Sequence, residues 1–192
     1  MTVIHQEDLV RSIATIIRQE DFIQSIADAF QYISYYHPVD YIKALAQAYE
    51  REESAAAKDA IAQILINSRM CAEGHRPICQ DTGIALVFLK VGMDVRWDAT
   101  LSVQEMVNEG VRRAYLDPGN KLRASVLLDP AGKRINSKDN TPAVVHYKIV
   151  PGERLEVICA AKGGGSEAKS KFAMLNPSDD LVEWVLKTVP TM

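Results

Sequence analysis

Apolar residues in the first third of the chain recur at the spacing of amphipathic helices. A first helix is predicted from the i, i+4, i+7 and i+8 spacing of Leu9, Ile13, Ile16 and Ile17. The same periodicity over residues 22–33 predicts a second helix. Pro38 suits the first turn of a third, and Ser54 is a suitable N-cap for a fourth that ends near Arg69. We therefore expect this part of the chain to be helical, and it shows no catalytic pattern.

Beyond residue 70 the apolar pattern changes to that of strands with one intervening helix. The nearly continuous apolar run over 84–91 predicts a buried strand. Ser102 and Glu105 have the spacing of a capping box, in which the cap hydroxyl and the later carboxylate each bind a free backbone amide. A helix is therefore expected to start there and to end at the turn that begins with Asp117.

The C-terminal part is predicted to contain a loop, two strands and a helix. The polar segment 129–141 has the composition of a loop. Apolar and polar residues alternate over 145–149 and 155–159, so we expect two strands joined as a hairpin by a Pro-Gly turn. Ser178 is expected to cap the last helix. These patterns predict an α+β fold, with an N-terminal helical segment followed by a mixed β-sheet with packed helices.

Length and composition agree with a globular protein of this class. The 192 residues suffice for one large domain, or for one domain with a small helical annex. We expect a helical subdomain over 1–70 and an α+β part over 71–192. Apolar residues make up 47% and charged residues 24%, close to the averages for globular proteins. With 22 basic and 25 acidic residues the net charge is −3, which argues against a nucleic-acid surface.

The cysteines and the N-terminal sequence bear on the compartment. Three cysteines cannot build a disulfide framework, which favours a reducing compartment. The chain begins with neither the basic start nor the uninterrupted apolar core of a signal peptide. Its longest apolar run, 84–89, is far shorter than the roughly 20 residues that span a bilayer. We therefore expect a soluble, cytoplasmic protein that does not bind a membrane.

Residues 76–83 form the first chemically unusual stretch. They place a thiol, an amide, a carboxylate and a hydroxyl in succession, at Cys79, Gln80, Asp81 and Thr82. A loop ahead of a buried strand is a common place to present ligands. The Cys79 thiolate could bind iron or zinc, and Asp81 could transfer or orient a proton. A buried cysteine beside an Asx turn explains the same residues, and both interpretations stay open.

Two further stretches carry candidate binding groups. The glycines Gly163, Gly164 and Gly165 follow a predicted strand, lie between lysines and let backbone amides approach an anion closely. Their spacing matches neither a phosphate loop nor a dinucleotide fingerprint, so a small carboxylate is the favoured ligand and a flexible connection is the alternative. Arg123 follows a turn and could bind a carboxylate through both guanidinium nitrogens, although an isolated arginine is usually a surface residue.

A zinc site is the less favoured hypothesis. Cys71, His75 and Cys79 are spaced by four residues, as ligands on one helix face would be. A glycine and a proline interrupt this stretch, however, and no fourth ligand is evident. Cys159 occupies an inward position of its predicted strand, so we interpret it as a core thiol.

In this order, the motifs resemble one enzyme family. The stretch 76–83, then Arg123, then 161–167 are similar to the N-terminal part of class I fumarate hydratases. These are oxygen-sensitive iron–sulfur enzymes related to the α subunit of L-tartrate dehydratase. The resemblance runs from about residue 5 to the end of the sequence. The combination of Cys-Gln-Asp-Thr-Gly and Lys-Gly-Gly-Gly-Ser is quite specific, whereas either motif alone would be weak.

The resemblance implies a cofactor and a set of site residues. The family interconverts fumarate and L-malate with a 4Fe–4S cluster held by three cysteines, and Cys79 resembles the first of them. The fourth iron has no protein ligand, so it binds the substrate and polarises its hydroxyl as a Lewis acid. By the same resemblance Gln80 and Asp81 contact the substrate, with Asp81 in a hydrogen-bonding or proton-handling role. Arg123 resembles a carboxylate clamp. The backbone that would line the substrate is that of Gly163, Gly164 and Gly165.

This sequence also departs from the family pattern. Members supply the other two cluster cysteines further along, beginning with a Cys-Pro-Pro motif, and Cys71 and Cys159 do not match them. The C-terminal domain that provides the catalytic base is absent too. We therefore expect this chain by itself to be apo and inactive, and the full-length enzyme to be a homodimer acting on a small dicarboxylate. The alternatives are an L-tartrate dehydratase, another dicarboxylate hydro-lyase, or a non-catalytic binding or assembly module.

Overall fold

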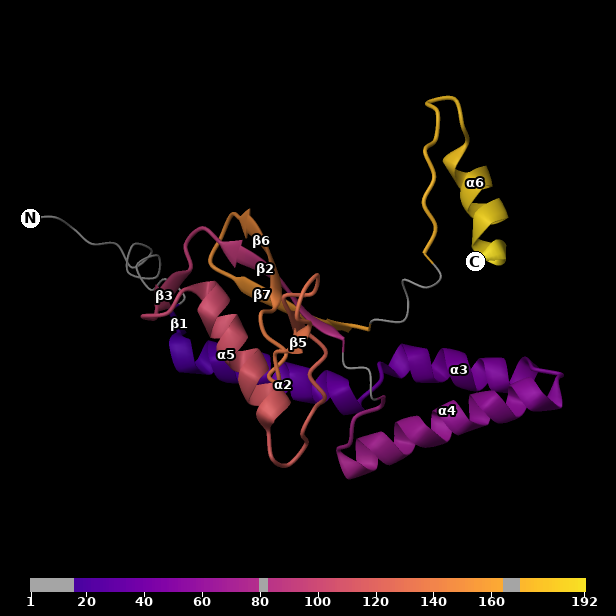
Figure 1. Cartoon of the computed structure of the whole chain (residues 1–192), viewed down its shortest axis with the longest axis horizontal. Helices are drawn as coiled ribbons and strands as arrows, with labels where there is room; N and C mark the ends of the chain where they lie inside the picture. The colour runs from indigo at the N-terminus through magenta and orange to yellow at the C-terminus, as the bar shows by residue number, and fades with distance from the viewer. Residues whose placement is uncertain (1–15, 80–82, 164–169) are drawn as a thin grey trace, which may run out of the picture. The chain divides into compact units, whose positions relative to one another are not determined.

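The computed structural model describes residues 16–79, 83–163 and 170–192 (Figure 1). Contacts divide the chain after Lys162 into a larger N-terminal unit and a C-terminal unit that begins at Gly163. The larger unit combines helices with a mixed sheet, which confirms the α+β class. No helix within the described ranges is both long and apolar enough to cross a bilayer.

The elements of the larger unit follow one another as strand, helices, strands, helix and strands. In chain order they are β1 (Ile16–Arg18), α2 (Gln19–Tyr35), α3 (Val39–Arg51), α4 (Ala55–Gly74), β2 (Ile84–Gly92), β3 (Arg96–Asp98), α5 (Val103–Leu116), β4 (Leu127–Leu128), β5 (Ile135–Asn136), β6 (Val144–Val150) and β7 (Leu155–Lys162). The C-terminal unit contains α6 (Leu181–Thr188) and the short 3₁₀ helix η2 (Val189–Thr191).

Strand β2 is the centre of a three-stranded sheet with the order β6-β2-β7. It runs parallel to β6 and antiparallel to β7. The expected hairpin between the last two strands is therefore wrong, because β2 lies between them. The link from β6 to β7 instead crosses the end of β2, where the Gly92 amide donates to the Arg154 carbonyl at 2.8 Å. A Cβ at Gly92 would lie 2.2 Å from the Gly152 oxygen, so the crossing requires glycine there.

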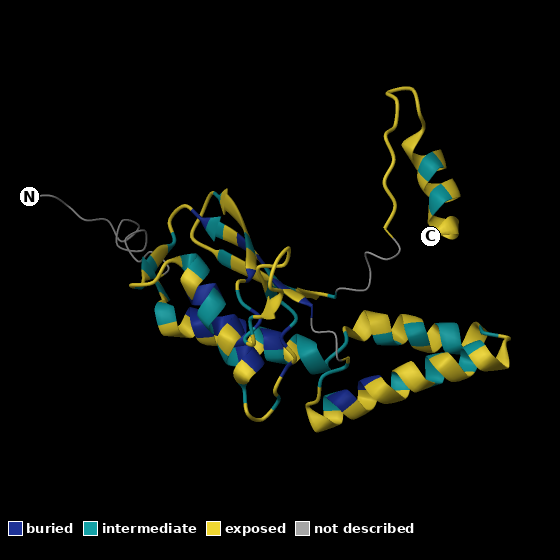
Figure 2. Cartoon of the chain, viewed as in Figure 1, coloured by how far each residue is buried: buried dark blue, intermediate teal, exposed yellow. Residues whose placement is uncertain are grey.

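The central strand is buried on one face only, which corrects the expectation of a strand buried on both (Figure 2). Ala85, Val87 and Leu89 are fully buried, whereas the alternate residues Ile84 and Phe88 are 44% and 41% exposed. The buried face belongs to a core made with α2 and α5. Its largest fully buried side chains include Tyr115, Phe30, Ile23, Ile26, Leu89 and Met106. The predicted periodicity of α2 is confirmed, since its apolar face faces this core.

The predicted helix caps have mixed outcomes. The capping box is confirmed, with the Ser102 amide 2.8 Å from the Glu105 carboxylate and the Ser102 hydroxyl accepting from the Glu105 amide. The Ser54 cap is confirmed as well, through its bond from the Ala57 amide. The Ser178 cap is wrong, because the last helix begins two residues later, with Asp180 as its N-cap. Both residues are good cap formers, so composition alone does not choose between them.

Other boundaries differ from the expectation. Ile16 and Ile17 lie in β1, which pairs in parallel with β3, so the first predicted helix is wrong at this end. The rest of that helix, with Leu9 and Ile13, lies outside the described residues. The polar segment 129–141 includes β5, which pairs with β4. Helices α3 and α4 both form, but α4 runs to Gly74, beyond the expected end near Arg69. Helix α3 buries no residue, and α4 buries only Ser68 and Cys71.

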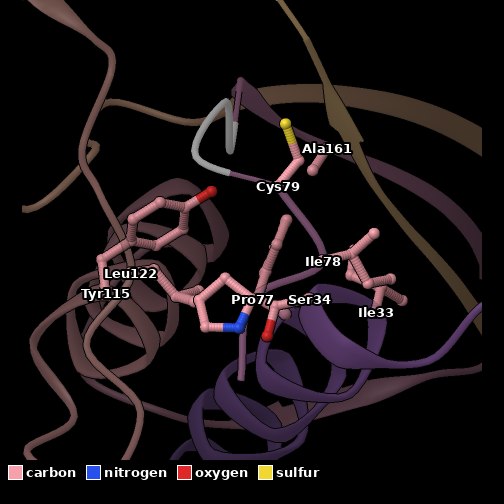
Figure 3. Close-up of a pocket in the computed structure, with 9 residues that line it drawn as sticks. Ile33, Ser34, Pro77, Ile78, Cys79, Tyr115, Leu122 and Ala161 are labelled. Atoms are coloured by element: carbon pink, nitrogen blue, oxygen red, sulfur yellow. The ribbon is translucent and has the colours of Figure 1, made fainter. Parts of the chain in front are cut away.

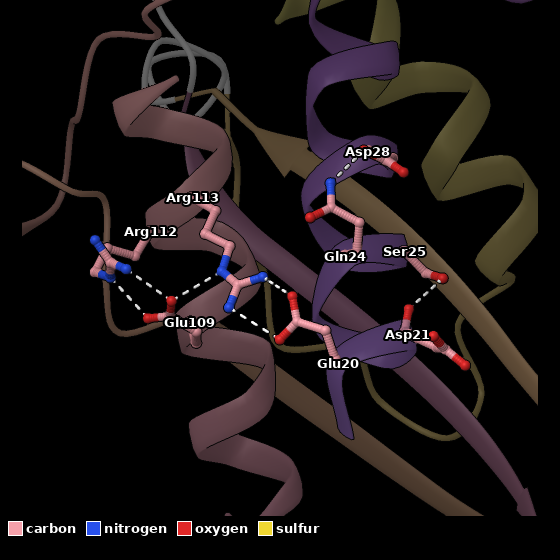
Figure 4. Close-up of polar contacts among 8 residues, drawn as sticks. All are labelled: Glu20, Asp21, Gln24, Ser25, Asp28, Glu109, Arg112 and Arg113. Atoms are coloured by element: carbon pink, nitrogen blue, oxygen red, sulfur yellow. Dashed lines mark hydrogen bonds and ion pairs between the residues drawn. The ribbon is translucent and has the colours of Figure 1, made fainter. Parts of the chain in front are cut away.

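Helices α2 and α5 approach closely at Gly110. A Cβ there would lie 2.6 Å from Ile26 Cβ and 2.7 Å from the Ile23 carbonyl oxygen. Ion pairs also join the two helices near their ends, because Arg113 of α5 bonds both Glu109 on its own helix and Glu20 on α2 (Figure 4). Arg112 makes a two-pronged contact with Glu109 at 2.7 Å. The hydrogen bond from Arg112, followed by that from Arg113, lowers the pKa of Glu109 from its ordinary 4.5 to about 2.

Substitution of Gly110 by alanine is expected to destabilise the protein by about 1–3 kcal/mol, because backbone and a branched side chain must move to admit the methyl group. The intrinsic helix preference of alanine, about 1 kcal/mol, acts against this loss. Gly74→Ala is the matched control, since its Cβ would meet only flexible Arg76 atoms at 3.7 Å or more. Urea unfolding of both variants measures the difference. Equal stability of Gly110→Ala and the parent would contradict the close contact.

The Glu109 network predicts a pH dependence of stability. Its pKa is lower in the folded protein than in the unfolded chain, so the stabilisation is complete above about pH 4.5 and is lost as the pH falls toward about 2. We expect Glu109→Gln to remove about 1–2 kcal/mol at neutral pH and less at pH 2. The control Glu73→Gln breaks an exposed ion pair with Arg69 and is expected to change little. Unfolding free energies at several pH values test this, and parallel curves for parent and Glu109→Gln would refute it.

Candidate functional site

A cavity of about 150 Å³ lies under the loop that follows α4 (Figure 3). It is bounded by the C-terminal half of α2, the end of α5 and the last residues of β7. Cys79 is exposed at this cavity, and Ala161 of β7 also lines it. The cavity is lined by Phe30, Ile33, Ser34, Pro77, Ile78, Cys79, Tyr115, Leu122 and Ala161. Most of its lining side chains are apolar, and Cys79, Ser34 and Tyr115 add a thiol and two hydroxyls.

The helix that precedes the loop ends in a left-handed residue. His75 has φ 46° and its ring stacks on that of Tyr35, with the centroids 4.6 Å apart. The Arg76 amide donates to the Cys71 carbonyl at 3.1 Å, which closes the end of α4. The chain is thereby turned from α4 toward α2.

Three hydrogen bonds then fix the loop from both sides. The Ile78 amide donates to the Ser34 carbonyl of α2 at 2.8 Å. The Asn67 side-chain amide of α4 donates to the Ile78 carbonyl at 3.0 Å. The Cys71 thiol lies 3.6 Å from the Pro77 carbonyl and donates to it. The residue before Cys79 is thus held on both its amide and its carbonyl, which gives the thiol a defined position.

The register of the sheet brings two of the sequence motifs together. Because β2 and β7 are antiparallel, the first residue of β2, Ile84, lies opposite the last residue of β7, Lys162. The Cys79–Gly83 stretch ends where β2 begins, and Gly163 follows β7 directly. The described ends of the two motifs, Gly83 and Lys162, therefore lie at the same end of the sheet. Gln80, Asp81, Gly164 and Gly165 lie outside the described residues.

Arg123 lies in the segment between α5 and β4. It is exposed, and its neighbours Leu122 and Ala124 are buried. The Asn136 side-chain amide donates to the Ala124 carbonyl at 2.8 Å, which fixes the backbone on one side of the arginine. A short extended segment with buried alternate residues presents the remaining side chain, that of Arg123, toward solvent.

The start of this segment is connected to the Cys79 loop through α2. Gln31 donates to the Ala114 carbonyl at 2.6 Å and accepts from the Asn120 side chain at 2.8 Å. Asn120 also donates to the Ser34 hydroxyl at 3.2 Å, and it is the carbonyl of Ser34 that holds Ile78. Sequence reasoning missed this chain of contacts, because the residues that bond to one another lie far apart in the sequence.

Asn140 makes a second, direct connection between the segment that contains Arg123 and the Cys79–Gly83 stretch. It is fully buried, its Oδ1 accepts from the Ser125 and Val126 amides at 2.7 and 3.2 Å, and its Nδ2 donates to the Gly83 carbonyl at 3.0 Å. Sequence analysis placed this residue in an unremarkable polar loop. Its position in an Asp-Asn-Thr-Pro sequence ahead of a strand is the only signal it offers.

The zinc hypothesis is not supported by the arrangement of its three residues. The Cys71 thiol is buried and bonded to Asn67 and Pro77, while the His75 ring is stacked on a tyrosine. No group of three or more metal-ligating side chains occurs among the residues that the structure describes. Burial raises the pKa of Cys159 to about 11, and this thiol packs against the core as expected.

The donor set at the cavity fits part of an iron–sulfur site. Cluster irons bind thiolates, and a 4Fe–4S cluster with one open iron needs three of them. Within the described ranges Cys79 is the exposed thiol at the cavity, and the other two cysteines are buried or packed on the core. The described residues therefore offer one ligand, and a complete site would need two thiolates from elsewhere.

Comparisons with known proteins relate the chain to hydro-lyases. The profile of the fumarate hydratase (Fumerase) family matches residues 23–192. A Methanocaldococcus jannaschii protein provisionally named L(+)-tartrate dehydratase subunit alpha is 32% identical over 168 residues, which are 84% of this chain and 58% of that protein. The anaerobic class I fumarate hydratase of Escherichia coli is 32% identical over 133 residues, or 69% of this chain and 24% of that enzyme. Fumarate hydratase 2 of Leishmania major is 30% identical over 171 residues, or 85% of this chain and 30% of that enzyme.

The chain thus spans little more than half the length of the first relative and less than a third of the other two. Its similarity nevertheless includes the loop, the strands and the arginine segment described above, since the family profile covers residues 23–192. On this match, the chain belongs to the fumarate hydratase (Fumerase) family.

Proposed function

We propose that this chain is the N-terminal part of a 4Fe–4S hydro-lyase that interconverts fumarate and L-malate, with Cys79 as one of the cluster ligands. The observation that carries the proposal is the exposed Cys79 thiol at a cavity that is also lined by Ala161 of β7. The names of the relatives, which are fumarate hydratases and tartrate dehydratase subunits, support the reaction class.

The chain's residues divide the work of binding and orienting a dicarboxylate. Arg123 binds one carboxylate in bidentate fashion, because a guanidinium matches the geometry of that group. Gln80 and Asp81 contact the substrate from the loop after Cys79, and Asp81 hydrogen-bonds or handles a proton. The backbone amides of Gly163, Gly164 and Gly165 line the other side. A bound cluster with an open iron supplies the Lewis acid that makes hydroxide a feasible leaving group.

The remaining ligands come from residues outside this sequence. Cys79 is one thiolate, so two further cysteines and the catalytic base belong to another part of the protein or to a partner subunit. We therefore propose that the 192-residue chain by itself is apo and inactive, and that the complete enzyme is a dimer in the cytoplasm.

A tartrate dehydratase is the second candidate. The M. jannaschii relative, which is provisionally named L(+)-tartrate dehydratase subunit alpha and is 32% identical over 84% of this chain, supports this candidate. The substrate would then be tartrate, which differs from malate by one hydroxyl and still offers two carboxylates to the same site.

Replacement of Cys79 by alanine is expected to abolish both cluster binding and turnover in the holoenzyme. The complete reading frame, with its partner subunit if it has one, is reconstituted anaerobically with iron and sulfide, and the absorbance of fumarate is followed with malate as substrate. Cys159→Ala is the matched control, because that thiol packs on the core and does not line the Cys79 cavity. A turnover in Cys79→Ala equal to that of the control would refute the ligand role. Turnover with tartrate and none with malate would favour the second candidate.

Thiol protection gives a readout that does not depend on activity. In the apoprotein we expect iodoacetamide to modify Cys79 faster than Cys159, whose pKa of about 11 leaves little thiolate at pH 8. Cys71 is buried and should react only on unfolding. Cluster loading should protect Cys79 and leave the slow modification of Cys159 unchanged. Peptide mass spectrometry measures each site, and unchanged labelling of Cys79 after loading would contradict the proposal.

A further inference from the structure

We propose that Asn140 is a positioning residue, which holds the carboxylate-binding Arg123 at a fixed place relative to the Cys79–Gly83 loop. The inference rests on the proposed function, because it assumes that both groups act on one substrate. Asn140 itself is fully buried and is expected not to touch the substrate. Its role would be to join, through one side chain, two loops that approach the ligand from different elements.

The three hydrogen bonds of the side chain form a bridge. On one side Oδ1 accepts from the amides of Ser125 and Val126, the second and third residues after Arg123. On the other side Nδ2 donates to the carbonyl of Gly83, at the end of the cysteine motif. An amide can accept at one end and donate at the other. The bond to Gly83 is buried, where water cannot easily replace it, and the two bonds from Ser125 and Val126 are part-buried.

The backbone at and after Asn140 is held by its own conformation and by hydrogen bonds. Asn140 has a φ of 62°, a left-handed conformation that asparagine tolerates better than most residues. The Asp139 carboxylate accepts from the Thr141 amide at 3.0 Å and from its hydroxyl at 2.8 Å, which fixes the next residue. Further along, the Ala143 amide donates to Asn108 of α5 at 3.0 Å. The segment that follows Asn140 is therefore tied to α5, the core helix that contains Asn108.

Both ends that the bridge joins have little freedom of their own. Gly83 has a φ of 65° and leads directly into β2, the central strand. On the arginine side, Leu122 and Ala124 are buried on either side of Arg123. Loss of the bridge would thus leave Gly83 and the residues beside Arg123 anchored to their own elements, but would loosen the position of one relative to the other. A change of about 1 Å between a binding group and the reacting centre can cost about 100-fold in rate.

Asn136 offers a matched control for the test. Its side-chain amide also donates to the arginine segment, at the Ala124 carbonyl, over 2.8 Å. Unlike Asn140, it makes no bond to the Cys79–Gly83 loop among the contacts of the described residues. Loss of the Asn136 bond or of the Asn140 bonds should loosen the arginine segment locally, but only the loss of the Asn140 bonds should uncouple this segment from the Cys79–Gly83 loop.

The test compares Asn140→Asp and Asn136→Ala in the anaerobically reconstituted holoenzyme. Aspartate keeps the acceptor for the two amides and loses the donor to Gly83, so it breaks the bridge at one end. We expect Asn140→Asp to raise the KM for malate by about 10- to 100-fold with the cluster spectrum retained, and Asn136→Ala to change KM less than threefold. Asn140→Ser replaces Asn140→Asp if the latter does not fold.

A double-mutant cycle with Arg123→Gln separates positioning from general destabilisation. If Asn140 acts through Arg123, its effect on KM should largely disappear once the guanidinium is gone. Additive effects on KM, or equal effects of Asn140→Asp and Asn136→Ala in an active enzyme, would overturn the inference and leave the proposed function standing. A parent enzyme with no cluster and no turnover on malate or tartrate would overturn the proposed function, and the role of Asn140 with it.

Discussion

The pairing of β2 with a strand on either side is the constraint on which the rest of this structure depends. It fixes β6 and β7 at opposite edges of the sheet and sets the register of each. Because β7 is antiparallel to β2, the beginning of β2 and the end of β7 lie at the same end of the sheet. The inward residues of β2 also form the floor on which α2 and α5 pack. A slip of one residue would move both the core and the two motifs at once.

Polar contacts in this chain differ in what they contribute. The ion pairs of Glu109, Arg113 and Glu20 lie at the surface and join two helices that apolar packing already holds together. The bonds of Gln31 and Asn120 are part-buried and join α2 to the end of α5 and to the segment after it, and the bond of Asn140 to Gly83 is buried. Surface ion pairs are worth little on average, whereas a buried donor or acceptor is costly to leave unpaired. The amide side chains are thus the contacts on which the geometry of the site depends.

Features set by neighbours in sequence could be predicted, and features set by distant neighbours could not. The Ser102 capping box and the apolar face of α2 follow from spacings of three or four residues. The order of the strands in the sheet does not follow from such spacings. Alternation in β6 and β7 indicates which face is buried, but it does not indicate which strand lies alongside. Whether residues 1–70 form a separate subdomain stays a prediction.

The same distinction applies to the site. Cys79 and Arg123 could be chosen as candidates because a thiol in a loop and an arginine after a turn have recognisable chemistry of their own. Asn140 could not, because an asparagine in a polar segment is ordinary until the carbonyl it binds, 57 residues away, is known. The roles of Gln80, Asp81, Gly164 and Gly165 stay predictions, since these residues lie outside the described part of the chain.

The central place of β2 also has a consequence for the order of events during synthesis. The ribosome releases β2 well before β6, and β6 before β7, so the most apolar strand of the sheet emerges without either of its neighbours. Contacts that close over such long stretches of chain form slowly compared with helices. Until β7 arrives, the Cys79 loop lacks the opposite strand of its cavity. A nascent chain stalled before β7 would therefore carry a hydrophobic edge for a chaperone to cover.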